Sequence, residues 1–296
     1  MKEKNLKVFF KISFSLIILL VIFQVIRNEF ELDQVYRILS SAKPSNIFFF
    51  STITLLLIFL RSVRLMRFLI FLGFLKGNFW NLFAINNISV LVNNFFPLRL
   101  GDFIATGMLA KLTGVKRGIT VILMDRIVEL ILPTVIFLFY LLFNFYNNIK
   151  SLYLVLFVIF SIFICFILKN YFIKFSTLFT RLELKKNLKE IVFWVIIIWL
   201  FSLLQYWLGV TSLIDNTSIF VVIICLSSAY FSITLSLTPT SVGVFHGAVS
   251  GSLIFFKIDP NTALAISILI HFLSLVINLI VGMISVIIYN RVVKTS

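Results

Sequence analysis

Three ionisable side chains lie close together in an otherwise apolar stretch: Asp125, Arg126 and Glu129, between Gly118 and Phe143. The stretch is long enough to cross a bilayer, where each central charge costs roughly 2.5–3.5 kcal/mol. A chain retains such charges where they face one another, a cavity or a polar ligand. They form either a structural ion pair between helices or a polar site lining a path through the membrane, and we favour the second interpretation.

A helix through this stretch places Asp125 and Glu129 on one face, one turn apart, with Arg126 within reach of Glu129. Pro133, four residues after Glu129, removes the helical hydrogen-bond partner of the Glu129 carbonyl. The charges and the carbonyl together would make a polar pocket, although Pro133 can also be a plain kink.

The composition sets the surroundings of these charges. The chain of 296 residues is 61% hydrophobic and 12% charged, with a mean hydropathy of +1.12. A soluble domain cannot bury so much apolar surface, so the sequence predicts an all-α polytopic membrane protein with about eight transmembrane helices. We expect residues 1–296 to form a single membrane domain. The predicted spans are 8–26, 46–66, 118–143, 152–169, 191–209, 218–237, 240–257 and 262–289.

The net charge of +15 comes largely from basic clusters between these spans. The clusters are residues 2–11, 61–76, 111–117, 169–189 and 291–294. Placing them in the cytoplasm satisfies the positive-inside rule for a multi-pass protein of the cell membrane with both termini cytoplasmic. The basic charge therefore indicates topology and lipid contact, not nucleic-acid binding. Residues 30–42 are predicted to form a short helix on the outer surface.

Residues 79–112 do not fit a simple crossing, because basic clusters flank the segment on both sides. Its middle, from Asn93 to Asp102, contains Asn94, Pro97, Arg99 and Gly101, which interrupt any helix. We predict a re-entrant hairpin, and irregular backbone at membrane depth requires a protein-lined cavity. With Arg99 and Asp102 added, the embedded charges would be two positive and three negative.

A second interruption occurs in the broken segment 238–257. Both interruptions contain a Pro followed four residues later by a Gly, Pro97 and Gly101 in the first and Pro239 and Gly243 in the second. Two such segments in corresponding halves are typical of transporters built from structural repeats. Pro-x-x-x-Gly is also common by chance, so the sequence leaves the internal repeat open.

Each interruption is followed by a span that holds an ionisable group. Arg126 lies 24 residues after Asp102, and His271 lies 25 residues after His246. These are the two histidines of the chain, and an intramembrane histidine is either a hydrogen-bonded packing residue or a ligand or base. Their corresponding positions make both histidines candidate site residues.

Arginines recur at every third position in Arg61, Arg64 and Arg67, at the inner end of the second span. This pattern predicts one side of a helix at headgroup depth, which either recognises lipid phosphate or stops insertion. Arg64 and, at the first interruption, Asn94 are candidate contacts for a lipid headgroup.

The sequence lacks the usual signatures of a membrane enzyme. It contains no His-Glu-x-x-His, no Cys/His cluster and no Walker motif, so we expect no metal, no cofactor and no direct use of ATP. Cys165 and Cys225 lie in apolar spans and are expected to be packing residues. An enzyme remains an alternative to a non-enzymatic function.

Four segments in this order resemble the transmembrane region of lysylphosphatidylglycerol synthases. They are Arg61-Ser-Val-Arg64-Leu-Met-Arg67, Asn94-Phe-Phe-Pro97-Leu-Arg99-Leu-Gly101-Asp102, Asp125-Arg126-Ile-Val-Glu129 and Thr238-Pro239-Thr-Ser-Val-Gly243-Val. The resemblance covers about residues 46–289 and implies a flippase-like, stand-alone member without the synthase domain. Family members usually carry an acid at the position of His246 and an Arg at that of His271, so this chain departs from the pattern there.

The residues and the resemblance together predict translocation of a polar lipid between leaflets through a central cavity. The expected partner is a membrane lipid with a phosphate-containing headgroup, such as a modified phospholipid or a lipid-linked saccharide. The substrate-binding candidates are Asn94, Arg99, Asp102, Asp125, Arg126, Glu129, Arg64, His246 and His271. The alternatives are a membrane-embedded transferase, with a histidine as base, and a subunit that recruits a lipid-modifying enzyme. A homo-oligomer is also open.

Overall fold

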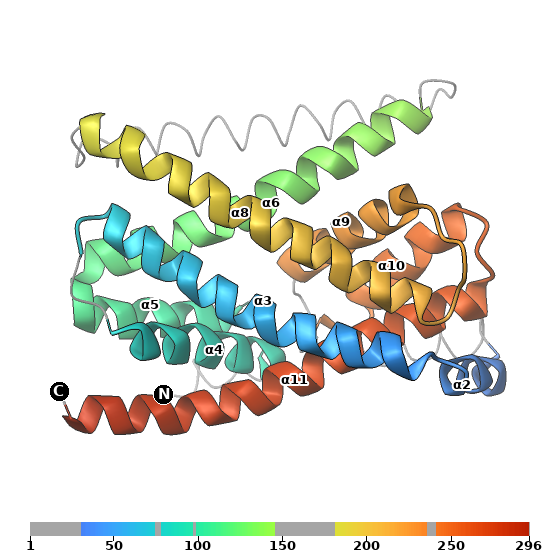
Figure 1. Cartoon of the computed structure of the whole chain (residues 1–296), viewed down its shortest axis with the longest axis horizontal. Helices are drawn as coiled ribbons and strands as arrows, with labels where there is room; N and C mark the ends of the chain where they lie inside the picture. Colours follow the sequence, from blue (N-terminus) through green and yellow to red (C-terminus); the bar gives the residue numbers. More distant parts are fainter. Residues whose placement is uncertain (1–30, 75–77, 97–98, 146–180, 236–240, 296) are drawn as a thin grey trace, which may run out of the picture.

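The computed structural model describes residues 31–74, 78–96, 99–145, 181–235 and 241–295. Within these ranges the chain is helical and contains no strand, as Figure 1 shows. The predicted all-α, polytopic architecture is confirmed. The predicted spans 8–26 and 152–169 lie outside the described residues.

The longest elements are α3 (Pro44–Phe71), α6 (Val115–Phe145), α8 (Arg181–Thr211) and α11 (Pro260–Thr295). Among the described residues, Pro44–Phe71, Lys189–Thr211 and Pro260–Arg291 are each long and apolar enough to cross a membrane. α3 starts at Pro44, where a missing N–H is not needed. α6 continues through Pro133, so this residue does not end the helix.

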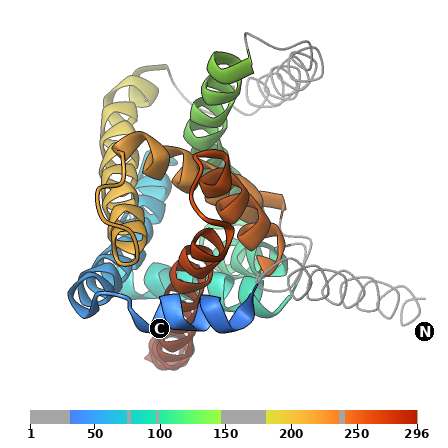
Figure 2. The same cartoon turned by 90° about the vertical axis from the view of Figure 1, so that its right-hand side faces the viewer.

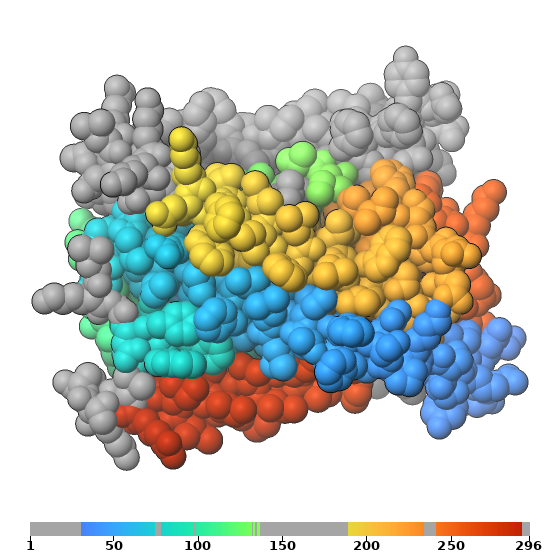
Figure 3. Space-filling model, in the orientation of Figure 1, coloured from blue at the N-terminus to red at the C-terminus, as the bar shows by residue number. Residues whose placement is uncertain are grey.

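Helices α3 and α8 run antiparallel along the length of the molecule (Figure 1). Gln205 Nε2 donates to Thr54 Oγ1 at 2.7 Å, and Asn46 Nδ2 donates to Thr211 Oγ1 at 3.1 Å. Their side chains form a continuous surface on the face drawn in Figure 3. Paired in this way, α3 and α8 extend across both halves of the fold.

The first short pair of helices is α4 (Phe79–Phe95) and α5 (Leu100–Thr113). Ser89 Oγ donates to Asp102 Oδ1 at 3.1 Å and the Gly101 N–H donates to Asn93 Oδ1 at 2.7 Å, so the helices are antiparallel. A Cβ at Gly101 would lie 1.9 Å from the Ser89 carbonyl oxygen, so only glycine permits this approach. The hairpin predicted over residues 79–112 is confirmed.

The second short pair is α9 (Ile219–Leu235) and α10 (Val244–Phe255). Ser228 Oγ donates to Ser252 Oγ at 3.3 Å, and the rings of Phe220 and Phe256 meet at 5.9 Å, which again gives an antiparallel pair. α10 has 12 residues. At about 1.5 Å per residue it spans about 18 Å, less than the roughly 30 Å core of a bilayer.

The expectation of two separate crossings at 218–237 and 240–257 is therefore corrected to a second hairpin. In Figure 1, α4 and α5 occupy one half of the molecule, and α9 and α10 occupy the other. The two hairpins enter the bundle from opposite ends of the molecule. Within each hairpin, the start of the first helix and the end of the second helix lie at the same end. Replacing two crossings by a hairpin leaves the predicted sides of all other segments unchanged.

The two halves repeat one another. α3–α4–α5–α6 and α8–α9–α10–α11 have the same order of long and short helices, α6 packs against α9, and α11 packs against α4. Left-handed backbone positions also recur at separations of 142 or 143 residues: Gly73 and Asn216, Arg99 and Ser241, Gly114 and Lys257. Such a repetition, with the halves entering from opposite ends, is an inverted structural repeat.

Each half has its own hydrophobic core. One cluster joins the ends of α3 and α6 to the first hairpin, and the other joins α8 and α11 to the second. Helix α2 (Leu32–Ser40) lies across the end of the bundle (Figure 2), with Val35 buried against Leu264 and Ala265. This agrees with the short surface helix predicted over residues 30–42.

Candidate functional site

A buried ion network joins α3 to α6. Arg64 is 1% exposed, and its Nε donates to Asp125 Oδ1 at 2.9 Å while its Nη2 donates to Glu129 Oε1 at 2.8 Å. The two carboxylates share one face of α6, as the sequence predicted. Arg64 does not lie on the surface of the protein, where a headgroup contact was expected, because this face of α3 packs against α6.

Arg126 lies among three carboxylates. Its Nη1 binds Glu129 Oε2, three residues on, as predicted. Its Nε lies 3.1 Å from Asp102 Oδ2, and its Nη2 lies 3.7 Å from Asp125 Oδ2. Arg126 therefore ties the first hairpin to α6, and its charge is balanced by its neighbours.

Asp102 is held by the tip of the first hairpin. Its Oδ1 accepts hydrogen bonds from Ser89 Oγ and Asn93 Nδ2, each at 3.1 Å. Arg99 Nε lies 3.7 Å from Asp102 Oδ2, which is a loose contact. Arg99 adopts a left-handed conformation with φ of 54°, so the chain turns there between α4 and α5. This turn leaves Arg99 facing the interior of the molecule.

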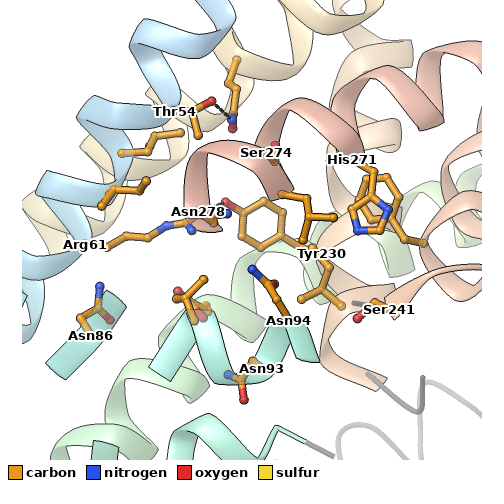
Figure 4. Close-up of a pocket in the computed structure, with 18 of the residues that line it drawn as sticks. Thr54, Arg61, Asn86, Asn93, Asn94, Tyr230, Ser241, His271, Ser274 and Asn278 are labelled. Atoms are coloured by element: carbon orange, nitrogen blue, oxygen red, sulfur yellow. Dashed lines mark hydrogen bonds between the residues drawn. The ribbon is translucent and has the colours of Figure 1, made fainter. Parts of the chain in front are cut away.

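A cavity of about 190 Å³ lies where the two hairpin tips meet α3, α8 and α11. Five predicted site residues line it: Asn94, Arg99, Arg126, Glu129 and His271. Asp102, Asp125 and Arg64 stand behind this wall, and His246 stands behind His271. In Figure 4, Arg61 from α3 and His271 from α11 lie on either side of Tyr230.

Arg61 was not singled out as a cavity residue by the sequence. Its Nη2 donates to the Tyr230 hydroxyl at 2.6 Å, and its guanidinium lies 5.9 Å from the centre of that ring. Among the described residues it forms no ion pair with a carboxylate, and its Nε is buried without a hydrogen-bond partner. The sequence did contain a signal for this position, because Arg61 lies three residues nearer than Arg64 to the middle of the predicted span 46–66.

The charge balance of the site differs from the prediction. The structure adds Arg61 and Arg64 to the predicted group, which gives four arginines against three carboxylates, Asp102, Asp125 and Glu129. The site is therefore net positive, whereas the sequence suggested a net negative group. The sequence could not indicate this excess of arginines, because it arises where α3 packs against α6 in the folded protein.

The two histidines are brought together across α10 and α11. His271 Nδ1 lies 3.2 Å from His246 Nε2, and His246 Nδ1 lies 3.1 Å from Ser267 Oγ. The ring of Phe245 stacks on that of His271 with centroids 4.6 Å apart. The pair is thus fixed by packing and hydrogen bonding, and one of its members faces the cavity.

These features define an all-helical membrane protein with a polar cavity between two opposed hairpins. The family model described as Lysylphosphatidylglycerol synthase TM region matches residues 8–282, and the chain belongs to this family. The protein described as UPF0104 membrane protein MJ1595, from Methanocaldococcus jannaschii, is 25% identical over 331 residues, which cover 95% of this chain and 96% of that relative. No solved structure matches the chain.

Proposed function

We propose that the protein moves a polar lipid with a phosphate-containing headgroup between the leaflets of the cell membrane. The observation that carries the proposal is a net positive cavity in which Arg61 Nε and Asn94 Nδ2 are buried donors without a hydrogen-bond partner among the described residues. Buried donors are normally hydrogen-bonded, so both are suited to acceptor oxygens of a ligand. Phosphate oxygens match the fork of an arginine.

An apolar surface next to the cavity favours a lipid over a soluble phosphate. The tip of the first hairpin carries Asn94 and Arg99, which line the cavity, and the exposed side chains of Phe95, Phe96 and Phe103. A ligand with a polar head and apolar tails matches both surfaces. The tails would stay in the bilayer while the headgroup crosses the protein. Membership of the family supports a lipid-related function.

The charged residues have different parts in this proposal. Arg61 and Arg99 contact the phosphate, because their pairing with carboxylates is absent or loose among the described residues. Arg126 and Glu129 form a wall of fixed shape. Arg64 and Asp125 hold that wall from behind.

The inverted repeat supports movement between the two sides. Two hairpins from opposite ends meet at one cavity, and rocking of one half against the other would open it to each side in turn. Arg67, Lys111 and Arg291 belong to basic clusters of the sequence, and their helices end together at one end of the molecule (Figure 1). We assign this end and both termini to the cytoplasm.

Reconstitution into liposomes tests the proposal. A fluorescent phosphatidylglycerol in both leaflets is reduced from outside with dithionite, and lipid masses are measured in parallel. We expect the reducible fraction to rise above that of protein-free vesicles, with lipid masses unchanged. A changed mass would favour the transferase instead. Unchanged masses without lipid movement, for this lipid and for a cationic or saccharide-bearing one, would contradict the proposal and favour a recruiting subunit.

A further inference from the structure

We propose that His246 and His271 form a proton-binding site, and that a proton binds there together with an anionic headgroup in the cavity. The inference rests on the proposed function and supplies it with a coupling ion. Its elements are the hydrogen-bond chain of the two rings, their place in the inverted repeat and the cavity that His271 faces.

The hydrogen bonds around the rings have one consistent direction. Ser267 Oγ donates to the carbonyl of Leu264 at 2.7 Å, so Ser267 accepts from His246 Nδ1. A neutral His246 then carries its proton on Nδ1 and accepts at Nε2 from His271 Nδ1. The neutral pair keeps both of these hydrogen bonds, and one added proton would give the pair a single positive charge shared between the two rings.

The pair occupies the place that an ion pair holds in the other half. Asp102 and His246 are each the third residue of the second helix of their hairpin, and Arg126 and His271 are each the twelfth residue of the helix that follows. Asp102 contacts Arg126 at 3.1 Å, as His246 contacts His271 at 3.2 Å. One half therefore carries fixed charges where the other carries two imidazoles, which can gain or lose a proton.

Other titratable or charged groups face the cavity from every helix packed around it. They are Arg61 on α3, Arg99 at the start of α5, Arg126 and Glu129 on α6, Tyr206 on α8 and Tyr230 on α9. α4 presents amides, including Asn86 and Asn94, and α2 presents apolar side chains to α11. The ordinary pKa values of these other groups lie far from neutral, whereas that of an ordinary imidazole lies at about 6.5, so the imidazoles are the groups best suited to take up a proton.

Proton and headgroup would favour each other's binding. A protonated pair adds one positive charge to the wall of the cavity, which attracts an anion in a medium of low dielectric constant. By linkage, the anion raises the affinity for the proton by the same factor. One proton would then cross with one anionic lipid, and a proton gradient would bias the direction of transport.

Proton uptake on binding is measured by calorimetry of the purified protein in buffers of different ionisation enthalpy, with dihexanoylphosphatidylglycerol as the probe. We expect uptake of up to about one proton per lipid near pH 7. The uptake should vanish in His271→Asn, which keeps a donor near the position of Nδ1 but does not titrate. Phe272→Leu, an exposed neighbour on the same helix, should retain it. Glycerol phosphate, as a second probe, separates a lipid from a soluble phosphate as the source of the anion.

A second variant distinguishes a loss of proton binding from a loss of folding. His246→Asp with His271→Arg copies the Asp102–Arg126 pair of the first half and should fold without binding a proton. In liposomes, a transmembrane pH difference should shift the steady-state distribution of labelled lipid in wild type but not in either variant. The inference would be overturned if lipid movement in wild type did not respond to the pH difference, or if proton uptake were equal in wild type and His271→Asn. Either result would leave the proposed function unaffected. Absence of any lipid movement would instead contradict the proposed function.

Discussion

Three arginines spaced three residues apart on α3 have three different environments. Arg61 faces the cavity, Arg64 is buried against Asp125 and Glu129, and Arg67 Nη1 lies 3.3 Å from Glu190 Oε2 at the surface. Residues three apart on a helix do not repeat the same direction, so the row turns gradually from the inside of the protein outward. The pattern alone is typical of a headgroup or stop-transfer row, and the approach of α6 gives each residue its own environment.

We expect Arg64 to be structural. Arg64→Met leaves Asp125 buried without its main partner, so the free energy of unfolding should fall by about 3–5 kcal/mol. The double variant Arg64→Met with Asp125→Leu should recover part of this loss, because no buried charge remains unpaired there.

Unfolding in detergent, followed by tryptophan fluorescence, measures both variants. Arg67→Gln is the control, since its exposed pair contributes under about 1 kcal/mol. Equal losses for Arg64→Met and Arg67→Gln would show that the buried network does not hold the fold together.

At the scale of elements, the first hairpin could be predicted from the sequence and the second only in part. Residues 93–102 combine amides, Pro, Arg, Gly and Asp, which no membrane helix accommodates, and basic clusters flank the segment. The segment around Gly243 is apolar on both sides, and hydropathy reports each side as a crossing. The length of α10 and its packing on α9 are tertiary properties, which a hydropathy pattern does not contain.

Gly101 should be essential for the first hairpin. In Gly101→Ala the new methyl group meets the Ser89 carbonyl, so α4 and α5 must separate, with a loss of about 1–3 kcal/mol or more. Gly107→Ala is the matched control on the same helix, because a Cβ there meets nothing within 4 Å. This change should stabilise α5 by up to about 1 kcal/mol. Thermal unfolding of both variants in detergent measures these changes in stability. Equal melting temperatures would contradict the close approach of α4 and α5 at Gly101.

At the scale of the whole molecule, the inverted repeat explains why both interruptions carry Pro and Gly at the same spacing. The sequence left this repeat open, because a short motif recurs by chance. The structure adds equivalent contacts and equivalent left-handed positions, such as Arg99 and Ser241, both of which line the cavity. The net charge of the site also belongs to this scale, because it depends on which helices meet.

The arrangement predicts the sides of the membrane on which the hairpins begin and end. In a background without Cys165 and Cys225, cysteines at Asn78 and Lys111 should react with an impermeant reagent from the cytoplasmic side. Cysteines at Ser218 and Lys257 should react from the opposite side. Labelling of Asn78 and Lys111 from different sides would make α4 and α5 a crossing, and labelling of Lys111 and Lys257 from the same side would remove the inversion.

In the proposed function, the phosphate of a lipid occupies the cavity and is bound there by Arg61. The most direct test is the rate of phosphatidylglycerol movement in liposomes that contain Arg61→Gln, compared with wild type and with Arg67→Gln. Loss of a charge-assisted hydrogen bond of about 1.5–3 kcal/mol predicts a rate lower by roughly 10-fold to 100-fold. Arg67→Gln, six residues further along α3 and outside the cavity, should move lipid within about twofold of wild type, as expected for an exposed pair. A folded Arg61→Gln protein that moves lipid at the wild-type rate would show that Arg61 does not bind the phosphate.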